Sequence, residues 1–308
     1  MTSPSDPNAP ASRSTVMSAA AGAAPAVFVL VWSTGFLGAR YGLPYADPFV
    51  LLTVRMVLAS LLLALLAVVL RQPMLTSWRQ AGWSAIIAVP LHVLYLGGVF
   101  WSIDAGLPVS VSALLASMQP VLVAAASGPV LGERVTARQW LGIGLGAIGV
   151  LLVLSPGLIH TEGASFPLIA GAAALIALLG GSTATLLQRR VGAGIPMLAG
   201  TSVQYLTAAV VLGVAALATE PLVIDWTGAF IGVLAWMVLA LSIGAVLLMF
   251  WLLRTGSAAR FASLYFLVPP VTLIEAYVLF GERLPLIELA GFALAVVGVA
   301  VVQRAGRS

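Results

Sequence analysis

Ten long apolar segments dominate this chain and restrict the folds that it can adopt. They lie near residues 23–41, 48–70, 82–103, 108–131, 137–155, 166–187, 196–218, 227–252, 259–280 and 285–303. Each approaches the roughly 20 residues that a helix needs to cross a lipid bilayer. Because backbone polar groups in lipid must be paired internally, we expect an all-α membrane protein with ten transmembrane helices.

The scarcity of charge supports the same fold class. Only 8% of the 308 residues are charged and 61% are hydrophobic, whereas soluble domains carry about 25% charged residues. Most of the surface is therefore expected to contact lipid. The sequence contains no cysteine, which excludes disulfides and thiolate metal sites. Its arginines occur singly or in pairs, so binding to nucleic acid has little support.

The distribution of arginine predicts the orientation of the spans. If the N-terminus lies in the cytoplasm, the opposite side receives only Arg40 and Arg283, and Arg55 falls within the second span. The cytoplasmic side then receives Arg13, Arg71, Arg79, Arg134, Arg138, Arg189, Arg190, Arg254, Arg260, Arg304 and Arg307. Cytoplasmic loops are enriched in basic residues, so both termini are expected inside. The arginine- and alanine-rich composition is typical of a GC-rich bacterial genome, which indicates a bacterial cytoplasmic (inner) membrane.

A nearly constant offset relates the two halves of the chain. Residues 149 positions apart include Gly132–Arg134 with Gly281–Arg283, Pro120 with Pro269, Gly142 with Gly291, Gly149 with Gly298, Ser33 with Ser182, and Thr34 with Thr183. An offset of 150 relates Phe100, Trp101 and Gly106 to Phe250, Trp251 and Gly256. One shared tripeptide would be weak evidence, but a constant offset along the chain indicates an internal repeat.

Three parts are expected along the chain. Residues 1–22 are rich in serine, proline and alanine and predict a flexible N-terminal tail, and two five-helix repeats follow at 23–155 and 166–303. Because each repeat contains an odd number of spans, the second copy must enter the membrane upside down. Such inverted repeats are typical of transporters, whose two related halves close alternately around a midplane site.

Three stretches carry a family resemblance: VWSTGFLGARYGLP, MQPVLVAAASGPVLGERVTARQWLGIGLGAIGVLLVL, and its second-half counterpart VPPVTLIEAYVLFGERLPLIELAGFALAVVGVAVV. The chain resembles the drug/metabolite transporter superfamily, specifically the EamA-type permeases. The resemblance covers nearly everything after the tail. It implies a cytoplasmic-membrane carrier, often an exporter of amino acids or other small metabolites, with a cavity between the halves.

The two Gly-Glu-Arg turns have a structural and a functional interpretation. Thr136 and Gln139 follow the first turn with the spacing of a helix capping box, and Pro285 and Glu288 follow the second. These residues favour helix capping, with a direct role in gating as the alternative.

Small residues mark one face of the last helix in each repeat. These are Gly142, Gly146 and Gly149 in the first repeat, and Gly291, Ala295 and Gly298 in the second. Small residues let helix backbones approach closely in lipid, so this face predicts tight packing. The packing partner is either a helix of the same chain or a second copy, which would make a homodimer through the glycine-rich helices.

Glu275, Arg55 and His92 lie well inside predicted spans, away from the span ends. A charge at the bilayer centre costs on the order of 3 kcal/mol. Glu275 is either a proton-coupling or cation-recognising carboxylate or a structural hydrogen-bonding group. Arg55, whose repeat equivalent is Gln204, is either structural or attracts an anionic substrate group. His92 is either a hydrogen-bonded packing residue or part of a site, with Tyr95 one turn later.

Prolines inside matching spans predict kinks around a central site. Pro120 and Pro269 free backbone carbonyls at equivalent positions, with Gln119 and Tyr265 nearby. The resemblance implies that residues around the fourth-span proline and a third-span aromatic line the cavity, which favours Gln119 and Tyr95 as substrate-binding residues. The other substrate-binding candidates are His92, Tyr265, Glu275, Trp32, Ser33, Ser182 and Thr183.

These observations favour a secondary transporter that moves a small amphiphilic metabolite, such as an amino acid, across the cytoplasmic membrane by alternating access. The favoured direction of transport is export. Its expected partners are the solute and the lipid bilayer. No cofactor or metal is predicted, since no Walker-type loop occurs and no ligand stands at metal spacing from His92. The alternatives are a membrane-embedded enzyme or a non-transporting membrane subunit. An enzyme is disfavoured because the sequence has no HExxH motif and only two histidines, His92 and His160.

Overall fold

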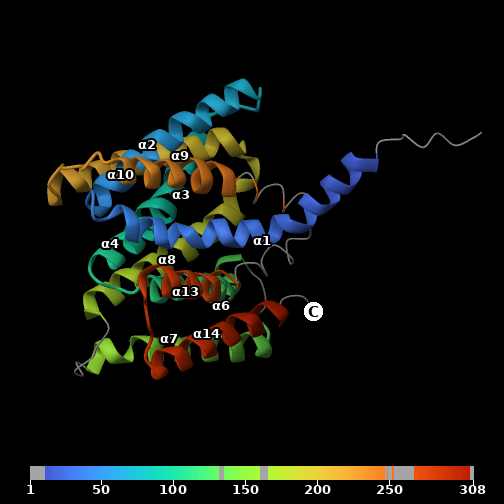
Figure 1. The fold of residues 1–308 in the computed structure, drawn as a ribbon. Coiled ribbons are helices and arrows are strands. Elements are labelled where there is room, and N and C mark those ends of the chain that lie inside the picture. The colour runs from blue at the N-terminus through green and yellow to red at the C-terminus, as the bar shows by residue number, and fades with distance from the viewer. Residues whose placement is uncertain are drawn as a thin grey trace, which may run out of the picture.

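The computed structural model describes residues 11–131, 135–159, 166–246 and 267–305, together with residues 248 and 252. The first half of the chain contains α1 (Ala11–Gly42), α2 (Pro48–Val69), α3 (Trp78–Ala88), η1 (Val89–Gly97), α4 (Gly98–Asp104), α5 (Val109–Ser117), α6 (Gln119–Leu131) and α7 (Ala137–Ile159). The second half contains α8 (Leu168–Val191), η2 (Gly192–Gly194), α9 (Met197–Thr219), α10 (Gly228–Ala235), η3 (Trp236–Ala245), α13 (Val268–Phe280) and α14 (Leu286–Ala305). The long helices run between two ends of the molecule, left and right in Figure 1.

The all-α fold class is confirmed for the described residues, in which the β-structure is a single isolated bridge between Ala46 and Ile224. Seven helical stretches of this part of the chain are long and apolar enough to cross a membrane. They fall in α1, α2, α3–η1–α4, α5–α6, α8–η2, α9 and α10–η3, and shorter apolar helices lie in α7, α13 and α14. Every one of the ten expected segments therefore contains a helix, while spanning length is established for seven.

Proline defines where four of the helices begin. Pro48 occupies the first turn of α2, and Pro108, Pro167 and Pro196 are the N-cap residues of α5, α8 and α9. A first-turn residue has no intrahelical acceptor for its N–H, so proline loses nothing there and its fixed φ favours the helix. The breaks read from the sequence are thus enforced by backbone chemistry.

The predicted capping box at the start of α7 is confirmed. The Thr136 N–H donates to Gln139 Oε1 at 2.7 Å, and the Gln139 N–H donates to Thr136 Oγ1 at 3.3 Å. The Gly-Glu-Arg turn at 132–134 lies outside the described residues. In the second copy, Gly281 ends α13 in the left-handed region with φ +67°, and its N–H donates to Tyr277 O at 3.0 Å.

The N-terminal helix begins earlier than the sequence suggested. Residues 11–22, assigned above to a flexible tail, belong to α1, which starts at Ala11. Alanine has the highest intrinsic helix propensity, and alanines are frequent in this stretch. The helix therefore extends toward the N-terminus beyond the apolar segment.

The third and fourth spans form the tight hairpin that their short connection predicts. α4 ends at Asp104 and α5 begins at Val109. Gly106 lies between them with φ +96°, a conformation that residues with a Cβ rarely adopt.

Two kinds of irregularity interrupt the spans. α5 ends at Ser117 and α6 begins at Gln119, immediately before Pro120, as the predicted kink requires. The π-helical segments η1 and η3 interrupt the third and eighth expected spans at matching places, and no pattern in the sequence indicated them. π-helical turns are uncommon and occur often at functional sites.

The glycine faces of α7 and α14 pack against each other within the chain. A Cβ placed on Gly149 would lie 2.5 Å from Ala295 N and 2.7 Å from Gly291 O. One placed on Gly142 would lie 2.7 Å from Gly298 O, so the early part of one helix meets the late part of the other. The two helices are therefore antiparallel and in backbone contact. A homodimer would need another surface, and dimerisation itself stays a prediction.

A second antiparallel pair joins α2 and α9. The Ser60 hydroxyl donates to Ser202 O at 2.9 Å, and the Ser202 hydroxyl donates to Ser60 O at 2.9 Å. Nearer the start of α2, Thr53 faces Gly213, whose missing side chain leaves space for it. The sequence offset makes α2 equivalent to α9 and α7 equivalent to α14, so equivalent helices of the two halves pair with opposite directions.

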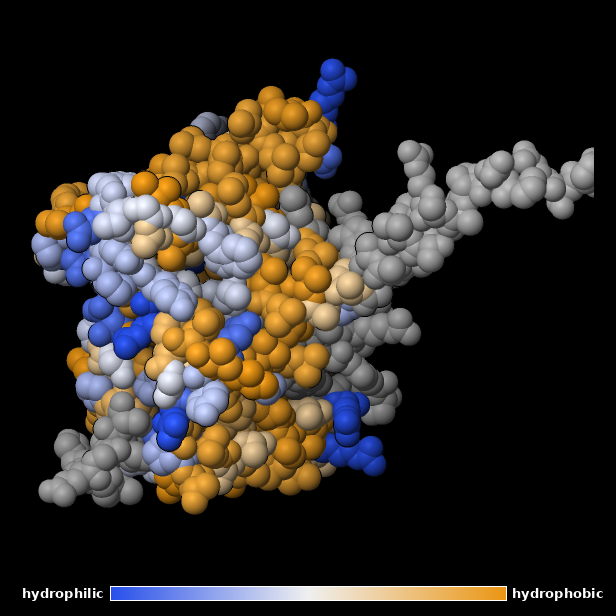
Figure 2. Space-filling model, viewed as in Figure 1, coloured by the Kyte–Doolittle hydropathy of each residue, from blue (hydrophilic) through white to orange (hydrophobic). Residues whose placement is uncertain are grey.

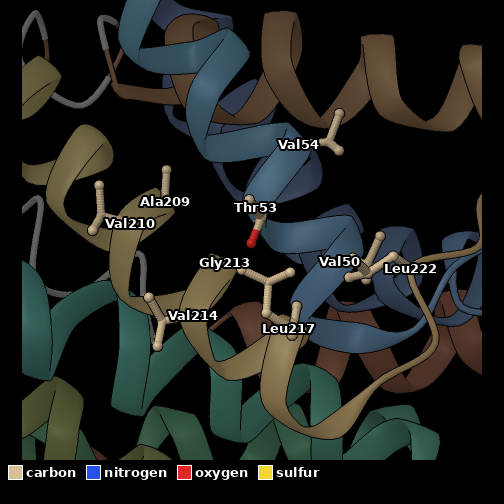
Figure 3. Close-up of a pocket in the computed structure, with 10 residues that line it drawn as sticks. Val50, Thr53, Val54, Ala209, Val210, Gly213, Val214, Leu217 and Leu222 are labelled. Atoms are coloured by element: carbon tan, nitrogen blue, oxygen red, sulfur yellow. The ribbon is translucent and has the colours of Figure 1, made fainter.

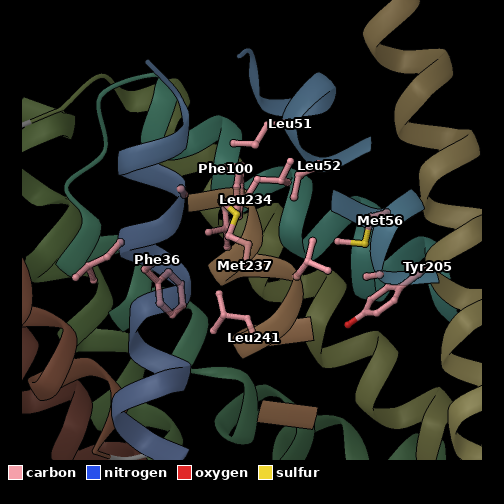
Figure 4. Close-up of a cluster of buried hydrophobic side chains, with 14 of the residues drawn as sticks. Phe36, Leu51, Leu52, Met56, Phe100, Tyr205, Leu234, Met237 and Leu241 are labelled. Carbon is pink, nitrogen blue, oxygen red and sulfur yellow. The ribbon is translucent and has the colours of Figure 1, made fainter. Parts of the chain in front are cut away.

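Apolar side chains fill the interior and also cover much of the outer surface. Leu51, Met56, Phe100, Met237 and Leu241 belong to a large buried cluster shared by both halves of the chain (Figure 4). On the face shown in Figure 2, apolar residues extend across the middle of the molecule, and polar residues gather toward its two ends. Such a surface fits a lipid environment and would be unfavourable in water.

Candidate functional site

A set of polar side chains is enclosed between the two halves of the chain, and we call it the central polar cluster. Its members are Arg55 of α2, His92 and Tyr95 of η1, Gln119 of α6, Gln204 and Tyr205 of α9, and Ser242 of η3. Polar groups are costly in an apolar interior unless they are hydrogen-bonded, and inside a membrane protein they often mark a functional site. Both halves contribute to the cluster, which makes it the candidate functional site.

Arg55 is the charged member of the cluster. Its side chain is only 6% exposed, and its Nε donates a hydrogen bond to Ser242 Oγ at 3.2 Å. Tyr205 and Tyr95 are close enough to interact with the guanidinium electrostatically. The hydroxyl of Tyr205 points from α9 into the interior (Figure 4), within reach of Ser242.

His92 lies on the other side of the same cluster. Its ring packs against the Tyr205 ring, with centroids 4.7 Å apart and planes inclined by 56°. The Gln204 carboxamide is near enough to interact with the imidazole. Neither ring nitrogen, however, has a hydrogen-bond partner among the described residues, although both are buried. These two nitrogens are polar groups available to a ligand.

The repeat offset organises these contacts. An offset of 149 relates Arg55 to Gln204, and an offset of 150 relates His92 to Ser242. The contact between Arg55 and Ser242 therefore corresponds to the approach of Gln204 to His92. Equivalent residues of the two halves thus surround one location, and the equivalent π-helical segments η1 and η3 supply one partner of each pair.

Tyr95 and Gln119, the two leading candidates from the sequence, are brought together. The Tyr95 hydroxyl lies within reach of the Gln119 carboxamide. Gly181 of α8 makes room for this carboxamide, since a Cβ there would lie 2.5 Å from Gln119 Nε2. Gly180, the preceding residue, lies against Leu94 and Pro90 of η1 in the same way. The kink before Pro120 and the two glycines together position Gln119.

Two further candidates form a separate pair. Ser33 of α1 lies 2.9 Å from Glu275 Oε1 of α13 and also 2.9 Å from Leu30 O. The second carboxyl oxygen of Glu275 is buried without a hydrogen-bond partner among the described residues. Trp32, the neighbour of Ser33, is half-buried and packs on Phe28 with ring centroids 5.3 Å apart.

Of the remaining candidates, Ser182 and Thr183 form no hydrogen bond with a member of the central polar cluster. Ser182 is buried, and its hydroxyl donates to Leu178 O within its own helix at 2.7 Å. Thr183 is exposed. Tyr265 lies outside the described residues. The structure thus unites His92, Tyr95 and Gln119, while Ser33, Glu275, Ser182 and Thr183 have other surroundings.

Sequence reasoning missed Tyr205 and Ser242 and treated Arg55 and Gln204 chiefly as structural. The repeat offset contained a signal for two of them, because it maps Arg55 onto Gln204 and His92 onto Ser242. Tyr205 had no such signal, since nothing in the local pattern distinguishes it from a packing aromatic.

Two carboxylates of the second half bind helix starts of the first half. Glu220 accepts from the Phe49 N–H at 3.0 Å and the Val50 N–H at 2.9 Å, and Glu282 accepts from the Ser110 hydroxyl at 2.7 Å. Burial raises the pKa of both carboxyls, while these hydrogen bonds pull each pKa back down. Glu282 therefore caps α5 of the first half. The prediction from the sequence concerned only the helix that follows the Gly-Glu-Arg turn of Glu282 itself.

An apolar groove on the outer surface has different chemistry. It has a volume of about 370 Å³ and lies between α2 and α9 (Figure 3). Its lining residues are Val50, Thr53, Val54, Ala209, Val210, Gly213, Val214, Ala216, Leu217 and Leu222. Thr53 is the polar residue among them, and no member of the central polar cluster takes part. This groove suits lipid chains and is a poor site for a polar solute.

Comparison with known families identifies the chain. The family model described as the EamA-like transporter family matches residues 22–155 and again residues 168–304. The chain belongs to the EamA-like transporter family. The EamA domain is thus present twice, and the resemblance drawn from the sequence is confirmed.

Relatives of this EamA-like transporter agree with the assignment. It is 25% identical to the uncharacterized transporter YvbV of Bacillus subtilis over 282 residues, 90% of this chain and 89% of that protein. It is 28% identical over 281 residues to a probable terminal-alkyne amino-acid exporter of Streptantibioticus cattleyicolor, covering 90% of this chain and 91% of that protein. The family and these relatives are transporters, not enzymes.

A solved crystal structure shares the fold of this EamA-like transporter. It superposes with a TM-score of 0.62 at 19% identity and covers 92% of this chain and 98% of the other. At this level of identity the likeness concerns the fold alone. The chain is therefore a multi-pass membrane protein of a transporter family.

Proposed function

We propose that this EamA-like transporter is a secondary carrier that exports a small amphiphilic metabolite, such as an amino acid, by alternating access. The observation that carries the proposal is the central polar cluster, in which Arg55 contacts Ser242 and Gln204 approaches His92 from the opposite halves. Transporters with internal repeats bind substrate at the interface between the repeats.

The architecture proposed is ten spans in two inverted five-helix repeats. The antiparallel pairing of α2 with α9, and of α7 with α14, supports it, because repeats inserted in one direction would present equivalent helices in parallel. The start of α1 and the end of α14 lie at the same end of the molecule in Figure 1, which fits an even number of spans. With the arginine distribution, this favours both termini in the cytoplasm of a bacterium.

Contacts between the halves occur at both ends of the molecule, as alternating access requires. At the proposed outer end, Glu282 binds Ser110, and the Asp225 N–H donates to Tyr45 O at 2.8 Å. At the proposed cytoplasmic end, Gln80 Nε2 donates to Gly194 O at 2.8 Å. Opening the site to either side would break one set of contacts while the other set holds.

The substrate class and direction follow from chemistry and one relative. The cluster combines hydrogen-bonding groups with aromatic rings and suits a small molecule with a polar and an apolar part. The Streptantibioticus relative is named a probable exporter of an amino acid, which supports the outward direction and an amino-acid-like solute.

Flux measurements test the function. Purified protein in proteoliposomes is expected to exchange radiolabelled amino acids from a panel, with saturation and with inhibition by unlabelled members. Gln204→Leu should reduce the flux strongly, and Arg79→Gln, a charge change at an exposed residue, should leave it unchanged. Non-saturable leakage, or equal flux with empty vesicles, would refute a carrier.

Reporter fusions test the architecture separately. Fusions within the turns at 132–134 and 281–283 should report opposite sides of the membrane, because inverted repeats place equivalent turns on opposite faces. Two reports from one side would exclude the inverted arrangement.

A further inference from the structure

The guanidinium of Arg55 lacks a counter-charge in its surroundings. Its side chain is 6% exposed, and the hydrogen bond that it donates to a described residue runs from Nε to the neutral hydroxyl of Ser242. Among the described residues no carboxylate lies within ion-pair distance, and its electrostatic neighbours are Tyr205, Tyr95 and His92. Neither terminal nitrogen of its planar fork donates a hydrogen bond to a described residue.

This arrangement is unfavourable for an empty structural site. An arginine stays protonated in proteins, and a buried charge is costly unless a partner of opposite sign compensates it. The carboxylates Glu220 and Glu282, which bridge the halves, are engaged at helix starts, and Glu275 lies beside Ser33. A purely structural role would be expected to bring one acidic side chain to Arg55.

The geometry of arginine indicates which partner is missing. Two parallel N–H groups match the two oxygens of a carboxylate, and such bidentate pairs are stronger than neutral hydrogen bonds. Ser242 orients the guanidinium through Nε and leaves that fork free. The hydroxyls of Tyr95 and Tyr205 are further donors nearby. The surroundings thus supply donors and positive charge for an anionic group.

The other half of the cluster differs in charge. At the repeat-equivalent positions, Gln204 replaces arginine, and the unpartnered imidazole of His92 replaces the serine. The described members of the cluster include no acidic residue, so no ion pair with a substrate ammonium group is available there. The cluster is therefore cationic on one side and neutral on the other.

We propose that Arg55 binds the carboxylate of the transported solute, so that the substrates are small organic acids whose carboxylate is required and whose amino group is dispensable. This assignment rests on the proposed function, because it names the substrate class of the same site. Amino acids and N-acylated amino acids both satisfy it, and their neutral amides do not.

A panel of matched compounds tests this assignment with the wild-type protein. For leucine and for phenylalanine, the radiolabelled free amino acid, the N-acetyl amino acid and the N-acetyl amide are compared as solutes for proteoliposome flux. If the protein transports compounds with one of these side chains, the flux of both acids should exceed the flux of the amide at least about tenfold. Tenfold is the lower end of the effect expected for a charge-assisted hydrogen bond. Flux of the amide equal to that of the acids would overturn the role of Arg55. If the protein carries other solutes saturably but none of these acids, the assignment is overturned and the carrier function stands. If it carries no solute above the level of empty vesicles, the proposed function is overturned instead.

Variants locate the preference at Arg55. Arg55→Gln should remove the preference for the acid over the amide. This substitution introduces glutamine, the residue that the second half has at the equivalent position, Gln204. The swap Arg55→Gln with Gln204→Arg should restore part of the preference, since it moves the charge to the equivalent position. Arg79→Gln, at an exposed arginine, is the control and should change nothing. Size-exclusion chromatography checks folding, and retention of the preference in a folded Arg55→Gln variant would refute the assignment.

Discussion

Gly149 provides a sharp test of how α7 and α14 are held together. A Cβ added there would lie 2.5 Å from Ala295 N, 2.7 Å from Gly291 O and 2.8 Å from Ala295 Cα. All three contacts are to backbone, so no side chain can rotate away to relieve them. Favourable separations for such atoms are about 3.5–4.0 Å, so Gly149→Ala requires the helices to move apart by about 1 Å.

The cost can be isolated with a matched glycine on the same helix. Overpacking a close contact typically costs about 1–3 kcal/mol. Replacing glycine by alanine also favours a helix by up to about 1 kcal/mol, which offsets part of that cost. Gly144 has nothing within 4 Å of its added Cβ, so Gly144→Ala retains the propensity gain without the clash. The difference between the two variants is therefore the clash itself, about 1–3 kcal/mol.

Thermal unfolding of the detergent-solubilised protein, followed by tryptophan fluorescence, measures this difference. Gly149→Ala should melt below the wild type, and Gly144→Ala at or above it. Gly298→Ala, on the facing helix, should behave like Gly149→Ala, because its Cβ would also meet backbone atoms of α7. If Gly149→Ala and Gly144→Ala melted at the same temperature, the two glycine faces would not be in backbone contact.

Three further outcomes follow from contacts between the halves. In a double-mutant cycle, the effects of Ser60→Ala and Ser202→Ala on stability should couple by about 0.6 kcal/mol. This is the average for hydrogen bonds between membrane helices. Additive effects would contradict the two reciprocal hydrogen bonds between these serines. Because burial raises the pKa of Glu282, the folded state binds its proton more tightly than the unfolded state, and stability falls as the pH rises above the usual pKa. As the pH rises above the usual carboxyl pKa of 4.5, the wild type should therefore lose more stability than Glu282→Gln. Equal slopes would exclude this carboxyl as the source. Glu275→Gln should make flux independent of a proton gradient, measured with and without an imposed pH difference, whereas unchanged dependence would rule out coupling at this residue.

The last of these expectations has a basis in hydrogen-bond counting. Ser33 lies within bonding distance of both Leu30 O and Glu275 Oε1, but its hydroxyl carries one proton. A protonated Glu275 that donates to Ser33 lets the serine donate to Leu30 O at the same time. When Glu275 is ionised, the Ser33 proton can serve only one of these two acceptors. The pair therefore has two arrangements that differ by one proton.

Much of the fold was predictable because its causes are local. Apolar length defined the spans, proline fixed the starts of α2, α5, α8 and α9, and Thr136 with Gln139 produced the expected capping box. The proline and capping effects each act within about one helical turn, so they can be predicted from the sequence alone. The start of α1 at Ala11 was missed because proline and serine in the tail were given more weight than its alanines.

The site was less predictable because its contacts join residues that are distant in sequence. His92, Tyr95 and Gln119 were identified, but the π-helical geometry of η1 and η3 depends on packing that no local pattern encodes. Tyr205 enters the site through contacts with residues of other helices, namely the His92 ring, Arg55 and Ser242. The capping of α5 by Glu282 is likewise set by how the halves meet.

The repeat also explains why one charge in the cluster is informative. Two identical halves would place either two arginines or none at the positions of Arg55 and Gln204, and two adjacent guanidinium groups would repel each other. This chain has one cation at these two positions, on α2 of the first half. In the proposed alternating-access cycle, a solute bound to Arg55 would stay with that half while its contacts to Gln204 of the second half change. The affinity for the solute would then differ between the two open states through its contacts with Gln204. The charge of Arg55 would determine which solutes bind.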